Sequence, residues 1–542
     1  MPAPGMLENL RPFSHLRGTT LLWCITLCSA SAFLLFGYDQ GVLGGLTTQP
    51  TFLTAMGNPS PTRLGLIAAI YDIGAFTGAI LAAMFGMKTG RRWAIVIGCV
   101  LVTIGGALQA AATSQHMMLA GRIVAGIGNG INTSTIPTWV SETAKPHRRG
   151  PLVATQLSIV VFGLFFAYWL DYGCIKHLSG DATWRIPIAI QCVFALITLF
   201  TIPFLPESPR WLYAKGLIDD GNLVISRLRD IDIDHPIVSS TRAAILEVSH
   251  LEDSGESKGL NWRHIFYDPT EIKPTRRIML GVMLQFLQVF SGISLAVYYL
   301  NILFQVNLGF DYEKGALLSG FNTFTLWLGT LPPIWLVEKY GRRQVLMFGS
   351  ITMAASMITF TVCVAVNNTT SSYIGVAAIY AYMFFFGLSW QPVPWIYPPE
   401  IAPLNLRHIG GAASTGSEWI FAFVAVMAGP SAIAAVPWLM YFIFSVCTLF
   451  AIPFVYFCIP ETRGLSLEEL DFVFKDGPVR LSGKRNKAEW KRRIADGGGL
   501  DSEASGAAVK HIRHAEGQTI TPESESKEIV DTQLEFTGAR KE

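Results

Sequence analysis

Long apolar segments recur along this sequence and restrict its fold more than any other feature. A helix needs roughly 20 predominantly apolar residues to cross about 30 Å of hydrocarbon. Of the 542 residues, 51% are hydrophobic and 15% are charged, whereas a soluble protein carries roughly a quarter charged residues. The pattern therefore predicts an all-α membrane protein with twelve transmembrane helices. The predicted spans are 20–45, 64–86, 93–114, 117–139, 151–171, 184–205, 278–305, 315–337, 344–366, 373–398, 409–430 and 436–458.

The spans form two groups of six, separated by a charged stretch that contains two short amphipathic patterns. The last part of the chain is rich in Gly, Ser, Glu and Lys, and such a composition does not bury a core. We therefore predict disorder from about residue 497. The predicted organisation is an N-terminus (1–19), an N-terminal six-helix half (20–205), a linker with short helices (206–277), a C-terminal six-helix half (278–458) and a tail (459–542).

Basic residues are concentrated in the loops on one side of the predicted membrane. Positive charge marks the cytoplasmic face, so both termini are predicted to be cytoplasmic. The plasma membrane is the expected location, and the vacuole is the alternative. The net charge of +2 gives no indication of nucleic-acid binding, and none is expected. On the opposite face, Asn367 and Asn368 begin overlapping N-x-T sequons, which makes them candidate glycosylation sites.

The two halves repeat each other's loop motifs. TGRRW (89–93) returns as YGRRQ (340–344), and PESPR (206–210) returns as PETRG (460–464). Span four leads to SETAKPHRRG and span ten to PEIAPLNLRHIGG. Duplicated six-span units with a site between them near the midplane are typical of transporters.

Arginine and glutamate residues at the span ends suggest a cytoplasmic gate. We expect their ion pairs to cross-link the halves in one conformation and to break in the other. Alternatively, the arginines only set the topology. The first half has Met87 where the second half has an acid before GRR, so the first gate is expected to be weaker. The candidate gate residues are Arg91, Arg92, Glu142, Arg149, Glu338, Arg342, Arg343, Glu400 and Arg407.

Asp39, in FGYDQGVLGG, is a carboxylate near the end of the first apolar run. A charge at membrane depth costs at least ~2.5–3.5 kcal/mol and usually serves function. Arg122 is the cation that topology explains least, because it follows the start of span four on the face assigned as outside. A cationic partner favours the ionised acid and a dry pocket the protonated acid. A carboxylate under both influences can load and release a proton; a static ion pair is the alternative.

These motifs resemble the sugar porter family of the major facilitator superfamily, from about residue 20 to 475. The resemblance rests on the paired GRR motifs, PESPR, PETRG, AGRIVAGIGNG (120–130) and PVPWIYPPEI (392–401). GYDQG, NTSTIPTWVSE and FAYWLDYG look most like fungal members related to the yeast glycerol–proton symporter. The resemblance implies the major facilitator fold and, in proton-coupled members, a proton site formed by residues matching Asp39 and Arg122.

The resemblance also implies a solute site. Amide groups both donate and accept hydrogen bonds, and so suit the hydroxyls of a sugar or polyol. A lone glutamine in a bundle is otherwise often a contact between helices. Two positions depart from the family pattern, with Val289 and Ser294 replacing a glutamine and an asparagine. The implied site residues are Phe36, Gln156, Gln285, Gln288, Ser294, Asn322 and Trp395.

Glu418, in ASTGSEWIFAF, is a further departure and another candidate substrate-binding residue. It stands where family members carry an amide, and Ala422 replaces another asparagine. Glu418 either binds solute hydroxyls or an amine, or is a second proton site, or pairs structurally with a cation. Asp72 is another intramembrane acid, for which we expect a structural or gating role.

Enzyme function is not expected. The glycine-rich AGIGNG lies inside an apolar span with no preceding strand, so close helix packing explains it better than a nucleotide loop. We find no metal-ligand spacing and no nucleophile–base pattern, and we expect no cofactor. The expected partners are a sugar or polyol, protons and the lipid bilayer. The main prediction is proton-coupled uptake by alternating access. The alternatives are an exporter of a small specialised metabolite and a nutrient sensor.

Overall fold

The computed structural model describes residues 16–143, 149–253, 274–402, 407–463 and Phe474. The chain divides into two compact units, Met1–Arg480 and Leu481–Glu542. The second unit lies outside the described residues, as does the segment predicted to be disordered. The described residues are almost entirely helical and contain no β-strand.

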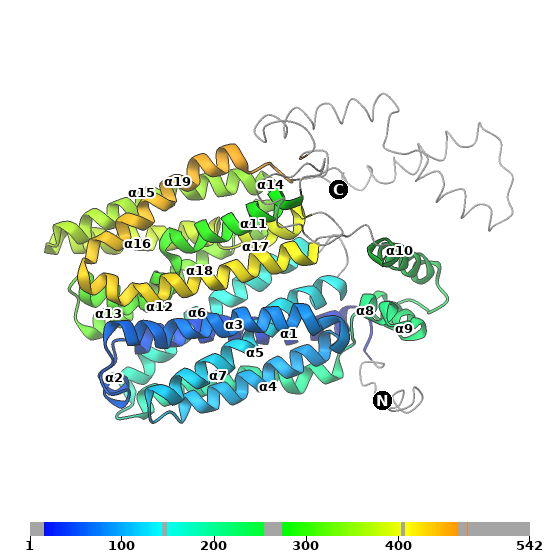
Figure 1. The fold of residues 1–542 in the computed structure, drawn as a ribbon, viewed down its shortest axis with the longest axis horizontal. Coiled ribbons are helices and arrows are strands. Elements are labelled where there is room, and N and C mark those ends of the chain that lie inside the picture. Colours follow the sequence, from blue (N-terminus) through cyan, green and yellow to red (C-terminus); the bar gives the residue numbers. More distant parts are fainter. Residues whose placement is uncertain (1–15, 144–148, 254–273, 403–406, 464–473, 475–542) are drawn as a thin grey trace. The chain divides into compact units, whose positions relative to one another are not determined.

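The N-terminal half is built from six long helices (Figure 1). Ser60 caps the start of the second of them by accepting a hydrogen bond from the backbone N–H of Arg63. A short helix, α2 (Pro50–Ala55), joins the first two. The long helices are α1 (Gly18–Leu46), α3 (Pro61–Thr89), α4 (Arg91–Ala110), α5 (Gln115–Thr143), α6 (Arg149–His177) and α7 (Ala182–Thr201).

The described part of the C-terminal half also consists of six long helical segments, but three of them are interrupted. Pro332 and Pro333 separate α13 from α14, and Pro392 precedes α17. Between α11 and α12 the chain is π-helical over Val289–Ile293, where Gly292 has a φ of 105°. The elements are α11 (Pro274–Gln288), α12 (Ser294–Ile302), α13 (Tyr312–Thr330), α14 (Pro333–Tyr340), α15 (Arg342–Val366), α16 (Thr369–Leu388), α17 (Val393–Ile401), α18 (Arg407–Ala435) and α19 (Pro437–Cys458).

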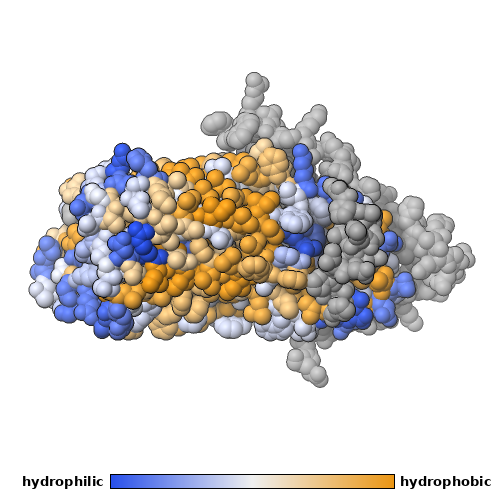
Figure 2. Space-filling model, turned by 90° about the horizontal axis from the view of Figure 1, so that it is seen from below, coloured by the Kyte–Doolittle hydropathy of each residue, from blue (hydrophilic) through white to orange (hydrophobic). Residues whose placement is uncertain are grey.

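The surface supports insertion in a bilayer. Ten helical segments in the described part of the chain are long and apolar enough to cross a membrane. The other two predicted spans correspond to α5, which is less apolar, and to the interrupted α13–α14. Hydrophobic residues form a broad band across the middle of the molecule, between polar ends (Figure 2). Large apolar side chains such as Trp23, Phe200 and Trp335 are more than 60% exposed, as expected of residues facing lipid.

Glycines allow the helices of the N-terminal half to pack closely. A Cβ on Gly126 would lie 2.3 Å from the carbonyl oxygen of Tyr71, and one on Gly130 would lie 2.0 Å from that of Ala75. A Cβ on Gly128 would lie 2.4 Å from the carbonyl oxygen of Gly98 on the other side of α5. The prediction that AGIGNG serves helix packing is confirmed. These contacts lock α3, α4 and α5 together.

Three shorter helices follow the first half: α8 (Pro209–Ala214), α9 (Ile218–Arg229) and α10 (Pro236–Asp253). The two amphipathic patterns noted in the sequence lie in α9 and α10. They pack on one another, and α9 also contacts α1. The two halves meet mainly where α3 packs against α18, α6 against α13 and α1 against α12.

Candidate functional site

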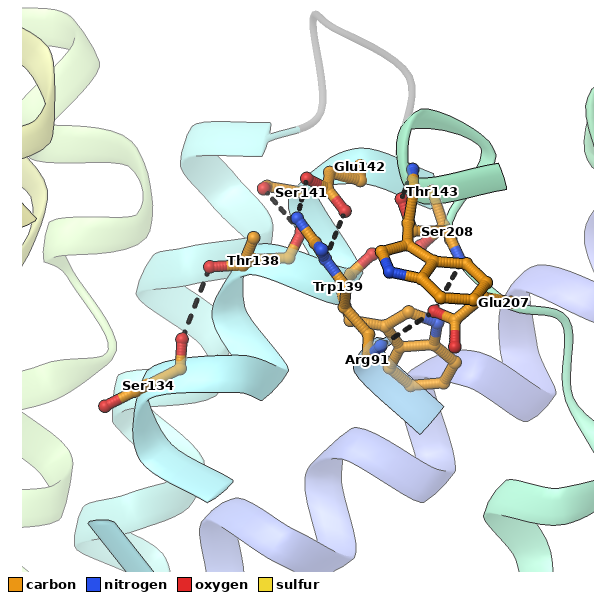
Figure 3. Close-up of polar contacts among 10 residues, drawn as sticks. Arg91, Ser134, Thr138, Trp139, Ser141, Glu142, Thr143, Glu207 and Ser208 are labelled. Atoms are coloured by element: carbon orange, nitrogen blue, oxygen red, sulfur yellow. Dashed lines mark hydrogen bonds and ion pairs between the residues drawn. The ribbon is translucent and has the colours of Figure 1, made fainter. Parts of the chain in front are cut away.

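One end of the bundle carries the two Gly-Arg-Arg turns, Gly90–Arg92 and Gly341–Arg343, and is called here the arginine end. At the first turn, the Glu207 carboxylate accepts a hydrogen bond from the backbone N–H of Arg91 at 3.0 Å (Figure 3). It accepts a second hydrogen bond, also at 3.0 Å, from the backbone N–H of Arg92. An acid at a helix N-terminus satisfies orphan N–H groups and complements the helix dipole. Glu207 therefore caps α4.

The C-terminal half repeats this arrangement. Glu461 accepts hydrogen bonds from the backbone N–H groups of Arg342 and Arg343, each at 3.0 Å, and so caps α15. The Trp139 indole donates to the Pro206 carbonyl in the first half. In the same way, the Tyr397 hydroxyl donates to the Pro460 carbonyl in the second half. The duplicated motifs thus build the same local structure twice.

The first arginine of each turn forms ion pairs. Arg91 contacts Glu142 at 3.0 Å, and Arg342 contacts Glu338 at 3.0 Å and Glu400 at 2.8 Å. Each second arginine donates to a backbone carbonyl: Arg92 to Pro203 and Arg343 to Tyr456. The side chains of Arg149 and Arg407 lie outside the described residues.

In this conformation the ion pairs of the arginine end lie within the halves. Arg91–Glu142 joins α4 to α5, and Arg342–Glu400 joins α15 to α17. Cross-linking of the two halves by these arginines belongs to the conformation in which the arginine end is closed, and it stays a prediction.

Bonds between the halves gather toward the opposite end, the end that carries α2. Asn301 of α12 donates to the Gly45 carbonyl of α1 at 3.0 Å. Tyr168 of α6 donates to the Val297 carbonyl at 2.7 Å, and Lys176 pairs with Glu313 at 3.4 Å. The hydroxyls of Thr62 and Ser431 lie 3.1 Å apart, and Gln305 donates to Thr48. In this conformation the halves are therefore joined at the opposite end.

Asp39 and Arg122 come together inside the N-terminal half. Their side chains form an ion pair at 3.3 Å, and both residues are at most 1% exposed. Arg122 also donates to the Ala68 carbonyl of α3 at 3.0 Å and lies over the Tyr71 ring at 4.5 Å. A buried charge pair is stable only when further partners satisfy its remaining groups. The arrangement gives Asp39 a cationic partner that is tied to a third helix.

Gln285 and Gln288 are held by the interruption between α16 and α17. Gln285 donates to the Pro394 carbonyl at 3.1 Å and Gln288 to the Trp390 carbonyl at 3.0 Å. In the described part of the chain, the amide oxygens of both glutamines have no hydrogen-bond partner. Buried polar atoms are normally paired, so these oxygens are available to a hydroxyl donor.

The other candidate solute residues occupy facing elements of both halves. Phe36 packs edge-on against Trp419 with ring centroids 5.6 Å apart, across the interface between halves. Asn322 is fully buried, and neither atom of its amide group has a hydrogen-bond partner among the described residues. Gln156 is buried with an unpartnered Nε2 by the same criterion, and Ser294 is also buried. Trp395 is half-buried beside the Gln285 acceptor, Pro394.

Glu418 is half-buried on α18, and its charge interacts with that of Asp72 on α3. Its Oε2 atom has no hydrogen-bond partner within the described residues. Asp72 in turn accepts a hydrogen bond from Tyr298 of α12 at 3.2 Å. Glu418 and Asp72, two acids within membrane-spanning helices, therefore lie near each other at the interface between the halves.

Sequence reasoning missed the roles of Glu207, Glu461 and Tyr298. The two glutamates stand at the same position of PESPR and PETRG, directly after a proline, so their equivalence was visible in the repeat. What was missing was that each motif folds back onto the start of a distant helix. Tyr298 gave no signal, because a tyrosine in an apolar run is normally a packing residue.

The two sequon asparagines lie in the turn between α15 and α16. Asn367 ends α15 with a left-handed φ of 47°, and Asn368 caps α16 by accepting from the Ser371 N–H at 2.7 Å. Both residues are exposed. The Asn368 amide oxygen is thus engaged in the cap.

Comparisons with known proteins extend over most of the chain. The family model described as "Sugar (and other) transporter" matches residues 23–474. The MFS-type transporter oryC of Aspergillus oryzae is 34% identical over 497 residues, covering 90% of this chain and 92% of that protein. The sugar transporter STL1 of Saccharomyces cerevisiae is 33% identical over 483 residues, covering 85% of this chain and 82% of that protein.

Solved structures show the same fold. The major facilitator superfamily proton:xylose symporter XylE, bound to 6-bromo-6-deoxy-D-glucose, matches with a TM-score of 0.70 and 24% identity, covering 84% of this chain and 100% of that chain. The inward-open conformation of XylE from E. coli matches with a TM-score of 0.67 at 24% identity, over the same shares. The predicted all-α major facilitator fold is confirmed.

Proposed function

The chain belongs to the sugar transporter family, and from that premise we propose that it takes up a sugar or polyol together with protons, by alternating access. The family and the fold are those of transporters rather than enzymes. The solved relative XylE is described as a proton:xylose symporter, and STL1 as a sugar transporter. These descriptions support a solute rich in hydroxyl groups.

The observation that carries the proton coupling is the buried pair of Asp39 and Arg122. At 3.3 Å, with both side chains almost fully buried, the guanidinium stabilises the ionised acid. Proton uptake by Asp39 removes this attraction and leaves Arg122 as a buried cation without its partner. Breaking a buried pair costs about 3–5 kcal/mol when the remaining charge is uncompensated. The proton therefore changes the balance between conformations of the site.

The solute site is proposed from the polar atoms between the halves. The free oxygens of Gln285 and Gln288, together with Asn322, accept hydrogen bonds from solute hydroxyls. Phe36 and Trp395 supply aromatic surface for the apolar face of a sugar ring. Since each glutamine amide already donates one hydrogen bond to the segment around the α16–α17 interruption, solute binding and the shape of that segment are linked.

The orientation follows from the charges. We assign the arginine end to the cytoplasm, because it carries the two Gly-Arg-Arg turns. The opposite end, where the halves are joined, is then extracellular. This places both termini in the cytoplasm and the Asn367 sequon outside. We propose the plasma membrane as the location.

The test is uptake by the purified full-length protein in liposomes. Labelled hexoses, pentoses, glycerol and longer polyols are offered with and without an inward proton gradient, and with a protonophore. The proposal expects at least one solute to accumulate above its external concentration only when the gradient is present. Uptake of every transported solute to no more than equilibrium, gradient or not, would refute proton coupling.

A second candidate is export of a small specialised metabolite, and Glu418 is the observation that favours it. An acid beside the solute site is better suited to bind an amine, or an unusual pattern of hydroxyls, than to bind a hexose. The same liposomes, loaded inside with a candidate solute, distinguish the two by the direction of proton-driven movement.

A further inference from the structure

Asp72 is a buried acid that the proposed mechanism, with Asp39 as the proton site, does not use. It is fully buried on α3, and one of its oxygens accepts a hydrogen bond from Tyr298 at 3.2 Å. Within the described residues its second oxygen has no hydrogen-bond partner. Tyr298 belongs to the C-terminal half, so this bond joins a membrane-embedded acid to the other half of the molecule.

Arg122 lies within reach of this acid. Its guanidinium donates to the Ala68 carbonyl at 3.0 Å, and Ala68 stands one turn before Asp72 on α3. Residues four apart lie above one another on the same helix face. The Nε atom of Arg122 has no acceptor in the described part of the chain, so it retains an unused donor.

The other groups facing Asp72 are few. Asp39 of α1, Tyr299 of α12 and Glu418 of α18 interact electrostatically with it, together with Arg122 and Tyr298. Arg122 is the single cation in this set. One guanidinium thus interacts with two carboxyl groups. A buried carboxylate needs a cation or strong hydrogen bonds to be tolerated.

We propose that Asp72 is the alternative partner of Arg122, and that Tyr298 links this choice to closure of the opposite end. The inference rests on the proposed function. When Asp39 binds a proton, its attraction for Arg122 ends and the guanidinium pairs with the Asp72 carboxylate. Arg122 then displaces the Tyr298 hydroxyl, and one bond between the halves is lost. The proton remains on Asp39, and no other proton moves in this step.

Substitutions of the two residues in the Asp72–Tyr298 contact should shift the pH dependence of uptake in opposite directions. In Asp72→Asn, Arg122 has only Asp39, so a higher proton concentration is needed to protonate Asp39. The pH of half-maximal uptake should fall by about one unit, a roughly tenfold change in proton affinity. In Tyr298→Phe, Asp72 is freed for Arg122, so the pH of half-maximal uptake should rise.

Tyr168→Phe is the matched control. It also removes one hydroxyl bond between the halves, to the Val297 carbonyl, but that bond involves no acid. Its uptake rate should change while its pH profile stays that of the wild type. The double variant Asp72→Asn/Tyr298→Phe should match Asp72→Asn, because the two residues act through one contact. If Asp72→Asn and Tyr298→Phe shift the profile in the same direction, or not at all, the proposal is wrong.

A conformational readout separates this inference from the proposed function. Asn301→Cys places a thiol at a buried site between the halves, where a membrane-impermeant maleimide reaches it only on opening. Without solute, labelling should rise as pH falls, and Asp72→Asn should remove that dependence. Labelling with these properties supports the switch even if no tested sugar or polyol is transported. Equal pH dependence in both backgrounds would refute it.

Discussion

The acids inside this membrane protein differ in what surrounds them. Asp39 has a guanidinium, Asp72 has a tyrosine hydroxyl, and Glu418 has no hydrogen-bond partner at one oxygen. Asp171, fully buried on α6, has no hydrogen bond to either oxygen within the described residues, and it lies against Gly45. Because an uncompensated buried charge is costly, each acid is a position where a proton changes the stability of the fold.

Asp39→Asn should abolish accumulation of solute while leaving exchange across equal concentrations. The amide keeps the shape of the side chain but neither binds the transported proton nor attracts Arg122. The measurement is gradient-driven uptake against counterflow in liposomes. Asp181→Asn is the control, since it makes the same change in an exposed pair with Arg185, worth roughly 0–1 kcal/mol. Concentrative uptake by Asp39→Asn would end the assignment of the proton site.

Glu418→Gln should keep transport but alter its selectivity. An ionised carboxylate only accepts hydrogen bonds, whereas an amide also donates them. The variant should therefore move toward ordinary hexose preference and lose part of its pH dependence. Competition by a panel of solutes is measured at two external pH values in wild type and variant. Superimposable profiles would mean that Glu418 is structural.

Side-chain partners were predictable only where motifs carried them. The Asp39–Arg122 contact was implied by two motifs, and the structure brings these residues together. The Tyr298–Asp72 contact joins positions 226 residues apart, and neither flanking sequence indicates it. Ion pairing between the arginines and the acids at the span ends was predicted, but that each pair lies within one half was not. Sequence shows which charges exist, while the helix packing decides which of them are neighbours.

The helices themselves were largely predictable, because each must bury a long apolar run. The span predicted at 20–45 is Gly18–Leu46, and that predicted at 344–366 is Arg342–Val366. The interruptions were not predicted. The length of an apolar run does not predict a glycine with a φ of 105° in the middle of a span, or the turn that separates α16 from α17. The turn after α16 and the start of α17 supply the carbonyl acceptors of Gln288 and Gln285.

Gly341→Ala should destabilise the start of α15. Gly341 has φ 93° and ψ 162°, a region essentially restricted to glycine, and a Cβ there would lie 2.3 Å from the Glu461 carboxylate. Conformations of this kind cost about 1–3 kcal/mol for other residues. The readout is the melting temperature of the purified protein. Gly86→Ala, in a helix with open space around the added carbon, is the control and should not lower it. An equal melting temperature for both variants would contradict the cap.

At the end that carries α2, opposite the arginine end, hydrogen bonds join the two halves. Thr62→Cys/Ser431→Cys replaces hydroxyls 3.1 Å apart on α3 and α18, so its disulfide should lock that end and stop transport. Reduction should restore it. Thr51→Cys/Thr183→Cys replaces hydroxyls 2.9 Å apart inside the N-terminal half, and its disulfide should leave transport intact.

Each single-cysteine variant must also be assayed, because the chain has eight free cysteines of its own. Transport that survives oxidation of Thr62→Cys/Ser431→Cys, with the disulfide verified by mass spectrometry, would show that this end does not separate during the cycle. Inhibition by the Thr51→Cys/Thr183→Cys disulfide would show that the first half does not move as a unit.

The helix caps at the arginine end also set an order of assembly during synthesis. The carboxylate that caps α4 is made 116 residues after Arg91, roughly 6–23 s later at 5–20 residues per second. The first half therefore completes its arginine end only when its sixth span has left the ribosome. The second half repeats this delay with Glu461, 119 residues after Arg342. Neither half can therefore complete its arginine end until its own last span has been synthesised.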